Sequence, residues 1–324
     1  MKYVLDSVIL TLSLAASISV YSSPPLSLLE AHTVAGSSGL DLSGLDLCDE
    51  LLLTVSDKTE DRVFSLEPVN SGYAVGEYLQ LDVPPHNHSR PWLRVLYSYL
   101  RGLVGQSTTD WEGVSCEGND IFLISEMFGS FLVASKDTSP IWRSVADQNI
   151  VGDLPLYERF SIGFETISVI DRQSVFIGHE REPAAGLIFI FSPEPGRISD
   201  FIPIMSIPGY IAPSHGSEDI TGSDIHGDVL YTLHRSSRQI CAQKITPPFK
   251  DFLGCRSFAS TEKAEAYAYT SMTYGRAEGL AVTDDKLYVI LDNNGDELIS
   301  NGSSEALLFV FQNPWRPAVP IGRL

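Results

Sequence analysis

An all-β fold built from repeated units is the prediction for this 324-residue sequence, and an internal repeat carries that prediction. In each repeat a polar residue and a glycine or threonine open a short strand, and a polar or charged side chain follows about thirteen positions later. The stretches are Ser43–Asp57, Glu112–Glu126, Glu165–Glu180, Thr221–Arg235 and Glu278–Asp292. A period of roughly 50 residues is typical of blades that cannot bury both faces alone. The sequence therefore predicts a five-bladed β-propeller, with six blades as the alternative.

Within each repeat, the pattern predicts a short strand, a polar turn, an apolar strand, a loop and a third strand. Runs of Val, Ile, Leu, Phe and Tyr suit strands that are buried between neighbouring blades. The predicted third strands are Arg62–Leu66, Ser130–Ala134, Gly186–Phe191, Gln239–Ile245 and Ala306–Phe311. Ser27–Ala35 precedes the first repeat, and we expect it to add the outer strand of the last blade and close the ring. Pro314–Leu324 is the competing candidate for that place.

The interval between the first two repeats is the longest, and its extra residues lie between Pro84 and Asp110. Apolar side chains recur there at helical spacing, among them Trp92, Leu96 and Tyr99. This spacing predicts a short amphipathic helix inserted between blades one and two. We expect it to pack on the outside of the ring; docking to a membrane surface or a partner is the alternative.

The formal net charge of -19 argues against nucleic acid as a partner, because phosphate backbones require clustered Lys and Arg. Lys2 and the apolar run Val8–Val20 predict a secretory signal peptide over residues 1–22, followed by one propeller domain over residues 23–324. The run is shorter than the ~20 residues of a spanning helix, so we expect no membrane span in the mature chain. The predicted location is secreted or periplasmic, and we expect a monomer.

Four cysteines in an exported chain can form two disulfides. Cys241 and Cys255 flank a predicted connection between strands of the fourth repeat, which favours their pairing. Cys48 and Cys116 occupy like positions in the first hairpins of repeats one and two. Whether they pair is left open, because a disulfide requires Cα atoms within about 7 Å.

A closed ring brings the first polar residue of every repeat to one axis. These residues are Ser43, Glu112, Glu165, Thr221 and Glu278. Oxygen-only ligands of mixed charge suit a hard cation, so we predict a Ca²⁺ site formed by these five residues. The alternative is a water-filled channel in which neighbouring carboxyl groups keep their protons.

A second, chemically mixed ring is expected at one mouth of the channel, directly after the apolar second strands. We predict that Lys58, Glu126, Arg181, Arg235 and Asp292 bind a small anionic ester or phosphoester substrate. Candidate catalytic residues are Glu165, His179 and His234, since histidine titrates near neutral pH. The alternative is that these charges form exposed ion pairs of little energetic weight.

The repeats resemble the SdiA-regulated family of exported β-propellers and, more loosely, the esterase-like phytase-related propellers. The resembling pieces are Asp41–Leu45, Trp111–Val114, Ile124–Glu126, Phe164–Glu165, His179–Arg181, Asp219–Gly222 and Ala277–Leu280. The order Ser, Glu, Glu, Thr, Glu is also similar to the axial calcium ligands of calcium-activated nucleotidase (apyrase) propellers, whose other blade motifs the chain lacks. The resemblance implies an exported calcium-binding propeller.

Two functional classes follow from these predictions. The first is a calcium-dependent hydrolase of phosphoesters or esters. The second is a non-catalytic ligand-binding or scaffold propeller of the cell envelope, in which calcium is structural. Propeller folds host both classes, so the fold does not choose between them.

Overall fold

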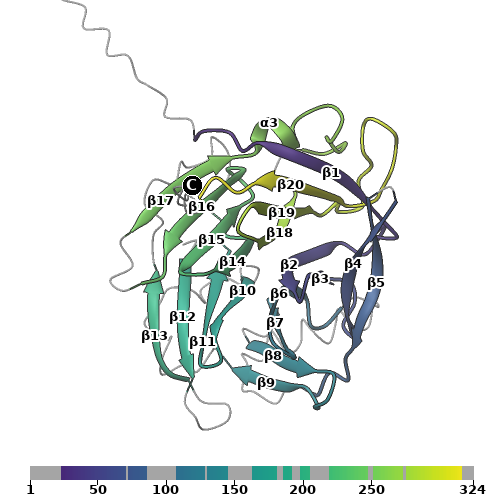
Figure 1. The fold of residues 1–324 in the computed structure, drawn as a ribbon. Helices are drawn as coiled ribbons and strands as arrows, with labels where there is room; N and C mark the ends of the chain where they lie inside the picture. Colours follow the sequence, from purple (N-terminus) through teal and green to yellow (C-terminus); the bar gives the residue numbers. More distant parts are fainter. Residues whose placement is uncertain are drawn as a thin grey trace, which may run out of the picture.

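The computed structural model describes residues 23–70, 72–85, 107–127, 130–144, 163–180, 185–191, 198–204, 219–246, 251–272 and 275–315. Regular structure within these ranges is almost entirely β, with one short helix, α3 (Ala259–Glu262) (Figure 1). The predicted signal peptide, residues 86–106 of the predicted inserted helix, Arg181 and residues 316–324 lie outside the described residues.

Within the described residues, the strands form three four-stranded sheets and one eight-stranded sheet. The first four-stranded sheet contains, in spatial order, β6 (Trp111–Glu117), β7 (Asp120–Ser125), β8 (Ser130–Ser135) and β9 (Ile141–Ser144). The second contains β10 (Phe164–Asp171), β11 (Ser174–His179), β12 (Ala185–Phe191) and β13 (Ile198–Ile204). The third contains β14 (Gly222–His226), β15 (Val229–His234), β16 (Gln239–Lys244) and β17 (Phe252–Ser257).

The eight-stranded sheet joins the end of the chain to its beginning. Its spatial order is β18 (Ala277–Val282), β19 (Lys286–Leu291), β20 (Leu307–Gln312), β1 (Leu28–Ala35), β5 (Gly72–Gln80), β4 (Arg62–Val69), β3 (Leu51–Ser56) and β2 (Leu42–Cys48). The predicted third strands correspond to β4, β8, β12, β16 and β20, and are confirmed.

The innermost strands of the sheets surround a common axis (Figure 1). Strand β2 contacts β6, β6 contacts β10, β10 contacts β14, β14 contacts β18, and β18 contacts β2 again. The cycle is closed, and apolar side chains fill the space between successive sheets. This arrangement is consistent with the predicted β-propeller.

The N-terminal strand β1 completes the ring. From Leu28 to Thr33 it pairs antiparallel with β20, and its last two residues pair parallel with β5. Upstream, the Leu26 N–H donates to the carbonyl of Ser257 at the end of β17 at 2.8 Å. The segment therefore joins the outer strands of three successive parts of the ring. The expectation that Ser27–Ala35 adds the outer strand beside the last repeat is confirmed.

The glycines of the repeat lie where neighbouring inner strands touch. A Cβ atom on Gly279 would lie 2.5 Å from the backbone carbon of Gly44, and one on Gly44 would lie 2.7 Å from the Cα of Gly113. Gly44 also has a φ of +63°, in the left-handed region that disfavours side chains. Glycine recurs in the repeat because the inner strands approach one another this closely.

Two disulfides are present. Cys241 and Cys255 face each other across β16 and β17, with Cα atoms 4.0 Å apart, which confirms the expected pair. Cys48 and Cys116 are also bonded, with Cα atoms 6.0 Å apart, and they join the inner strands β2 and β6 of different sheets. Among the described residues, no helix has the length and apolar character needed to span a bilayer.

We predict that Gly279→Ala destabilises the protein by about 1–3 kcal/mol, because the added methyl group meets backbone atoms that cannot rotate away. Gly222→Ala is the matched control, since its Cβ would meet the Leu233 side chain at 3.0 Å and the nearest backbone atom of Leu280 at 3.3 Å. Urea unfolding of both variants measures the difference. Equal losses of stability would show that the Gly279 contact does not limit the packing of the ring.

Candidate functional site

Irregular strand pairing occurs at each of the three glutamates that open a repeat. The pairing of β6 with β7 shifts register across Glu112, and the pairings of β10 with β11 and β18 with β19 shift across Glu165 and Glu278. Such bulges leave one residue unpaired and redirect its side chain. Glu165 and Glu278 are buried, with exposed fractions of 7% and 6%, and Glu112 is half-buried.

The protonation of the Glu112 and Glu165 carboxyl groups is strongly affected by their surroundings. Burial raises the pKa of each well above its ordinary value, and the negative charge of neighbouring carboxylates raises it further. Glu112 and Glu126 are the neighbours with the largest effect on the pKa of Glu165. No hydrogen bond or ion pair joins the carboxyl group of Glu112 or Glu165 to another described residue. Ionisation of either group is therefore costly, and for Glu165 the charge of Arg235 offsets part of that cost.

A group of acids on the blade-two repeat has the dimensions of a metal site. Asp110, Glu112 and Glu126 each offer one carboxylate oxygen, and these oxygens lie within 4.8 Å of one another. An all-oxygen donor set of this kind fits a hard cation such as Ca²⁺. Glu112 belongs to the predicted calcium ligands and Glu126 to the predicted substrate-binding residues. Asp110 was not predicted.

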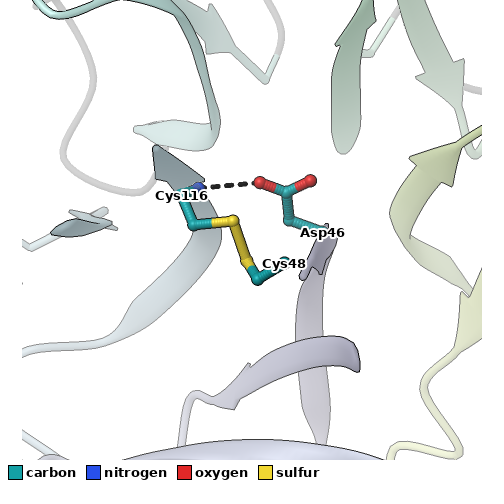
Figure 2. A group of neighbouring side chains, drawn as sticks. All are labelled: Asp46, Cys48 and Cys116. Atoms are coloured by element: carbon teal, nitrogen blue, oxygen red, sulfur yellow. Dashed lines mark hydrogen bonds between the residues drawn. A yellow bond between two sulfur atoms is a disulfide. The ribbon is translucent and has the colours of Figure 1, made fainter. Parts of the chain in front are cut away.

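A second group of possible ligand atoms also lies within 4.8 Å of one another, but it is unsuited to a metal ion. It consists of Asp46, Cys48 and Cys116, but both sulfur atoms are used in the disulfide (Figure 2). The Asp46 carboxylate instead accepts a hydrogen bond from the Cys116 N–H at 2.8 Å.

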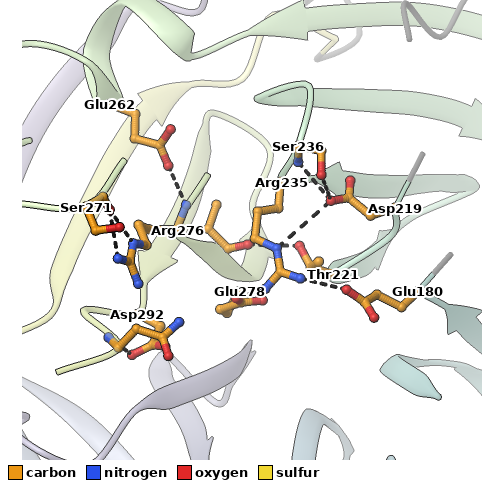
Figure 3. Close-up of polar contacts among 12 residues, drawn as sticks. Glu180, Asp219, Thr221, Arg235, Ser236, Glu262, Ser271, Arg276, Glu278 and Asp292 are labelled. Carbon is orange, nitrogen blue, oxygen red and sulfur yellow. Dashed lines mark hydrogen bonds and ion pairs between the residues drawn. The ribbon is translucent and has the colours of Figure 1, made fainter. Parts of the chain in front are cut away.

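On the other side of the channel, the Arg235 guanidinium lies among three carboxylates (Figure 3). It donates to Glu278 and to Glu180, the latter at 2.7 Å, and its Nε lies 3.9 Å from the Asp219 carboxylate. Burial lowers the pKa of Arg235, but the charges of Glu278, Glu165 and Asp219 outweigh burial and raise it. Glu278, a predicted calcium ligand, is therefore held by an arginine.

The two hydroxyl residues among the predicted calcium ligands are buried. The Thr221 hydroxyl donates to the carbonyl of Ala277 at 2.8 Å and so joins β14 to β18. Ser43 lies near the start of β2 with an exposed fraction of 5%. The structure thus divides the predicted ligands. Glu112 lies near other acids, Glu165 lies near other acids and also feels the charge of Arg235, and Glu278 and Thr221 have hydrogen-bond partners.

Two of the predicted substrate-binding residues, Glu126 and Asp292, share a backbone contact with Asp57 and Glu180, which also follow second strands. The N–H groups of Asp57, Glu126, Glu180 and Asp292 donate to carbonyls of residues that precede the inner strands. Burial raises the pKa of Asp57 to about 6, against the opposing charge of Lys58. Burial raises the pKa of Asp292 to about 7, and the negative charge of Glu278 adds to this.

Lys58 is about half exposed and forms ion pairs with Asp41 at 2.8 Å and Asp57 at 3.0 Å. Burial lowers its pKa, but its hydrogen bond to Asp41 and the charge of Asp57 outweigh burial and raise it. This basic side chain is thus compensated by carboxylates of its own repeat.

The histidines predicted to move protons lie in the wall of the ring. His234 is buried; its Nδ1–H donates to the Asp219 carbonyl at 2.5 Å and its Nε2 accepts from the Thr232 hydroxyl at 3.0 Å. Burial lowers the pKa of His234 to about 4. Ser56 and Ser125 end the corresponding strands and donate to loop carbonyls in the same way. This correspondence favours a structural role for His234.

His179 ends β11 and is likewise buried, with an exposed fraction of 2%. Its ring meets that of Phe164 edge-on, with centroids 5.9 Å apart. Arg181 lies outside the described residues.

The sequence prediction missed a set of aspartates that precede the inner strands. Asp41, Asp110 and Asp219 each lie three positions before the glycine of their repeat, and all are buried. Their common offset was the available signal.

A second missed set follows the glycine by two positions: Asp46, Ser115 and Asp224 accept the N–H groups of Cys116, Val169 and Val282 on the next inner strand.

No protein-family model matches the chain, and no curated protein matches it significantly. The solved structure of glutaminyl cyclase from Myxococcus xanthus is similar, with a TM-score of 0.50 and 10% identity over 89% of this chain and 97% of that chain. Virginiamycin B lyase from Staphylococcus aureus gives a TM-score of 0.42 and 8% identity over 87% and 99% of the two chains. These proteins have β-propeller-type folds. At such low identity, the similarity to glutaminyl cyclase shows the fold alone.

We predict that Glu165→Gln stabilises the metal-free protein at pH 7.5 by about 1–3 kcal/mol. The folded state binds the Glu165 proton more tightly than the unfolded state, so ionisation destabilises the fold as pH rises above about 4.3. Glutamine cannot ionise and avoids this cost.

Urea unfolding in chelator at pH 3.5 and pH 7.5 measures this effect, with the exposed Glu265→Gln as control. The gain should vanish at pH 3.5, where the carboxyl group is protonated in both states. A variant that is less stable than the wild type at pH 7.5 would contradict the prediction.

Proposed function

We propose that this protein is an exported β-propeller whose channel binds Ca²⁺, and that it hydrolyses a small anionic phosphoester or ester at the channel mouth. The observation that carries the proposal is the cluster of Asp110, Glu112 and Glu126, whose oxygens lie within 4.8 Å. Glu165 adds a buried carboxyl group with no hydrogen bond or ion pair among the described residues, and its pKa responds to Glu112 and Glu126.

We further propose that the ring has five blades. The eight-stranded sheet then counts as two blades that meet where Val34 and Ala35 pair with β5. Each half has four strands, β18–β19–β20–β1 and β5–β4–β3–β2. Export is supported by the two disulfides, since disulfides persist in oxidising compartments.

A cation explains how an acidic mouth accepts an anion. Carboxylates dominate the described channel residues, and the basic side chains Lys58 and Arg235 are already ion-paired. An anionic substrate is therefore repelled until positive charge is added. When bound, calcium supplies that charge and polarises the oxygen at which the reaction occurs.

The chain's own carboxyl groups supply the proton transfers in this proposal. Asp292, with a pKa of about 7, and Asp57, with a pKa of about 6, exist in both protonation states near neutral pH. General acid and base catalysis works best with such groups. These acids take the part that we first assigned to His179 and His234, which the ring wall buries.

The second candidate function is a non-catalytic ligand-binding or scaffold propeller of the cell envelope. The bonding of both His234 ring nitrogens and the ion pairs of Lys58 and Arg235 favour it. In this case calcium stabilises the ring and takes no part in a reaction.

We predict chelator-sensitive hydrolysis of p-nitrophenyl phosphate, a nucleotide or a short-chain ester by the purified protein. Glu112→Gln and Glu165→Gln should each lower kcat/KM at least about 100-fold, because each removes a charged metal ligand. Glu265→Gln, an exposed change, is the matched control and should keep full activity.

Melting curves with calcium and with chelator distinguish the two candidates. A large chelator-induced drop in Tm without turnover on any substrate would favour the scaffold. If neither turnover nor Tm responds to calcium, the proposed cation site is wrong.

A further inference from the structure

Arg235 lies where carboxylates of several repeats converge. Its guanidinium reaches carboxylates contributed by three parts of the ring: Glu180 after β11, Asp219 before β14 and Glu278 in β18 (Figure 3). The side chain is only 17% exposed, so these contacts form largely away from water. A guanidinium presents several N–H groups in one plane and can serve several carboxylates at once.

We propose that Arg235 is a built-in counter-ion that replaces a metal for Glu180, Asp219 and Glu278. An added Ca²⁺ ion then binds beside it, away from the axis, to Asp110, Glu112, Glu126 and Glu165. This inference rests on the proposed calcium binding and defines its ligands. It differs from the first expectation, in which Ser43, Thr221 and Glu278 complete a ring around a central ion.

The geometry of the acids supports an off-axis site. Calcium binds oxygen at about 2.4 Å, so two ligands of one ion lie at most about 4.8 Å apart. The oxygens of Asp110, Glu112 and Glu126 meet this limit. Glu165 is not one of this group, but it is 7% exposed and its carboxyl group has no hydrogen bond or ion pair among the described residues. The charges of Glu112 and Glu126 raise its pKa, and the charge of Arg235 lowers it.

The occupied side of the ring is poorly suited to a second cation. Glu278 is bound by the guanidinium, and a divalent ion there would be repelled by Arg235. The Thr221 hydroxyl donates to a backbone carbonyl, so its use as a ligand would break a contact between β14 and β18. Both features disfavour the symmetric, central arrangement.

Calcium titration by calorimetry tests the ligand assignment with a matched pair of variants. Glu112→Gln and Glu278→Gln remove the same charge from equivalent positions of two repeats. We expect Glu112→Gln to weaken calcium binding at least about 100-fold and Glu278→Gln to change it less than about threefold. Equal weakening by both variants would overturn the off-axis site while leaving calcium binding itself intact.

Arg235→Met tests the counter-ion role directly. Removal of the guanidinium releases Glu180, Asp219 and Glu278, so we expect an additional equivalent of bound calcium and a larger calcium-induced rise in Tm than in the wild type. Arg235→Lys keeps the positive charge and should bind the same number of ions as the wild type. An Arg235→Met protein that binds calcium with unchanged stoichiometry and gains no extra Tm from it would refute the role.

Near-ultraviolet circular dichroism of each variant in calcium shows whether the ring is folded. If Arg235→Met is unfolded, the pair Glu112→Gln and Glu278→Gln still decides the ligand assignment. Absence of calcium binding in the wild-type protein would instead refute the proposed cation site, together with this inference.

Discussion

The crowding of carboxylates around a closed axis is the constraint on which this structure depends. Inner strands meet so closely that glycine is required at Gly44 and Gly279, and register shifts occur at Glu112, Glu165 and Glu278. Burial raises the cost of the charge on these glutamates. Each such carboxyl group is therefore stabilised by a proton or by a positive charge beside it.

The chain meets this constraint differently in different repeats. Lys58 compensates Asp41 and Asp57 in the first repeat, and Arg235 compensates acids of three repeats. Proteins commonly use such internal cations, since a guanidinium is always charged and holds several oxygens. Glu112 and Glu165 differ, because no described side chain forms an ion pair with them. The repeats thus share one backbone arrangement but differ in how their acidic side chains are paired.

Much of the architecture could be predicted from the sequence, because strand patterns and glycine spacing are local signals. The strands β4, β8, β12, β16 and β20 and the closing role of β1 followed from apolar runs between turns. The Cys48–Cys116 bond could not be predicted, since it depends on the distance between two sheets.

The site was harder to predict than the fold. Residue type and spacing identify which side chains approach the axis, but the partner of each depends on its rotamer and on neighbouring sheets. Arg235 was predicted to bind a substrate, yet its guanidinium donates a hydrogen bond to Glu278. His234 was predicted to lie at the mouth, yet it ends its strand as Ser56 and Ser125 do, and its side chain likewise bonds to a loop carbonyl. The aspartates before the inner strands carried a periodic signal that becomes clear only when the repeats are superposed.

The pairing of β1 with β20 has a consequence for biosynthesis. Thr33 leaves the ribosome before its partner Leu307, which follows on the order of tens of seconds later at ordinary translation rates. Until then β1 has no antiparallel neighbour, and the nascent chain carries an open strand edge. Newly made molecules are consequently exposed to wrong pairings throughout synthesis, so a chaperone that shields the leading segment would raise the yield of native protein.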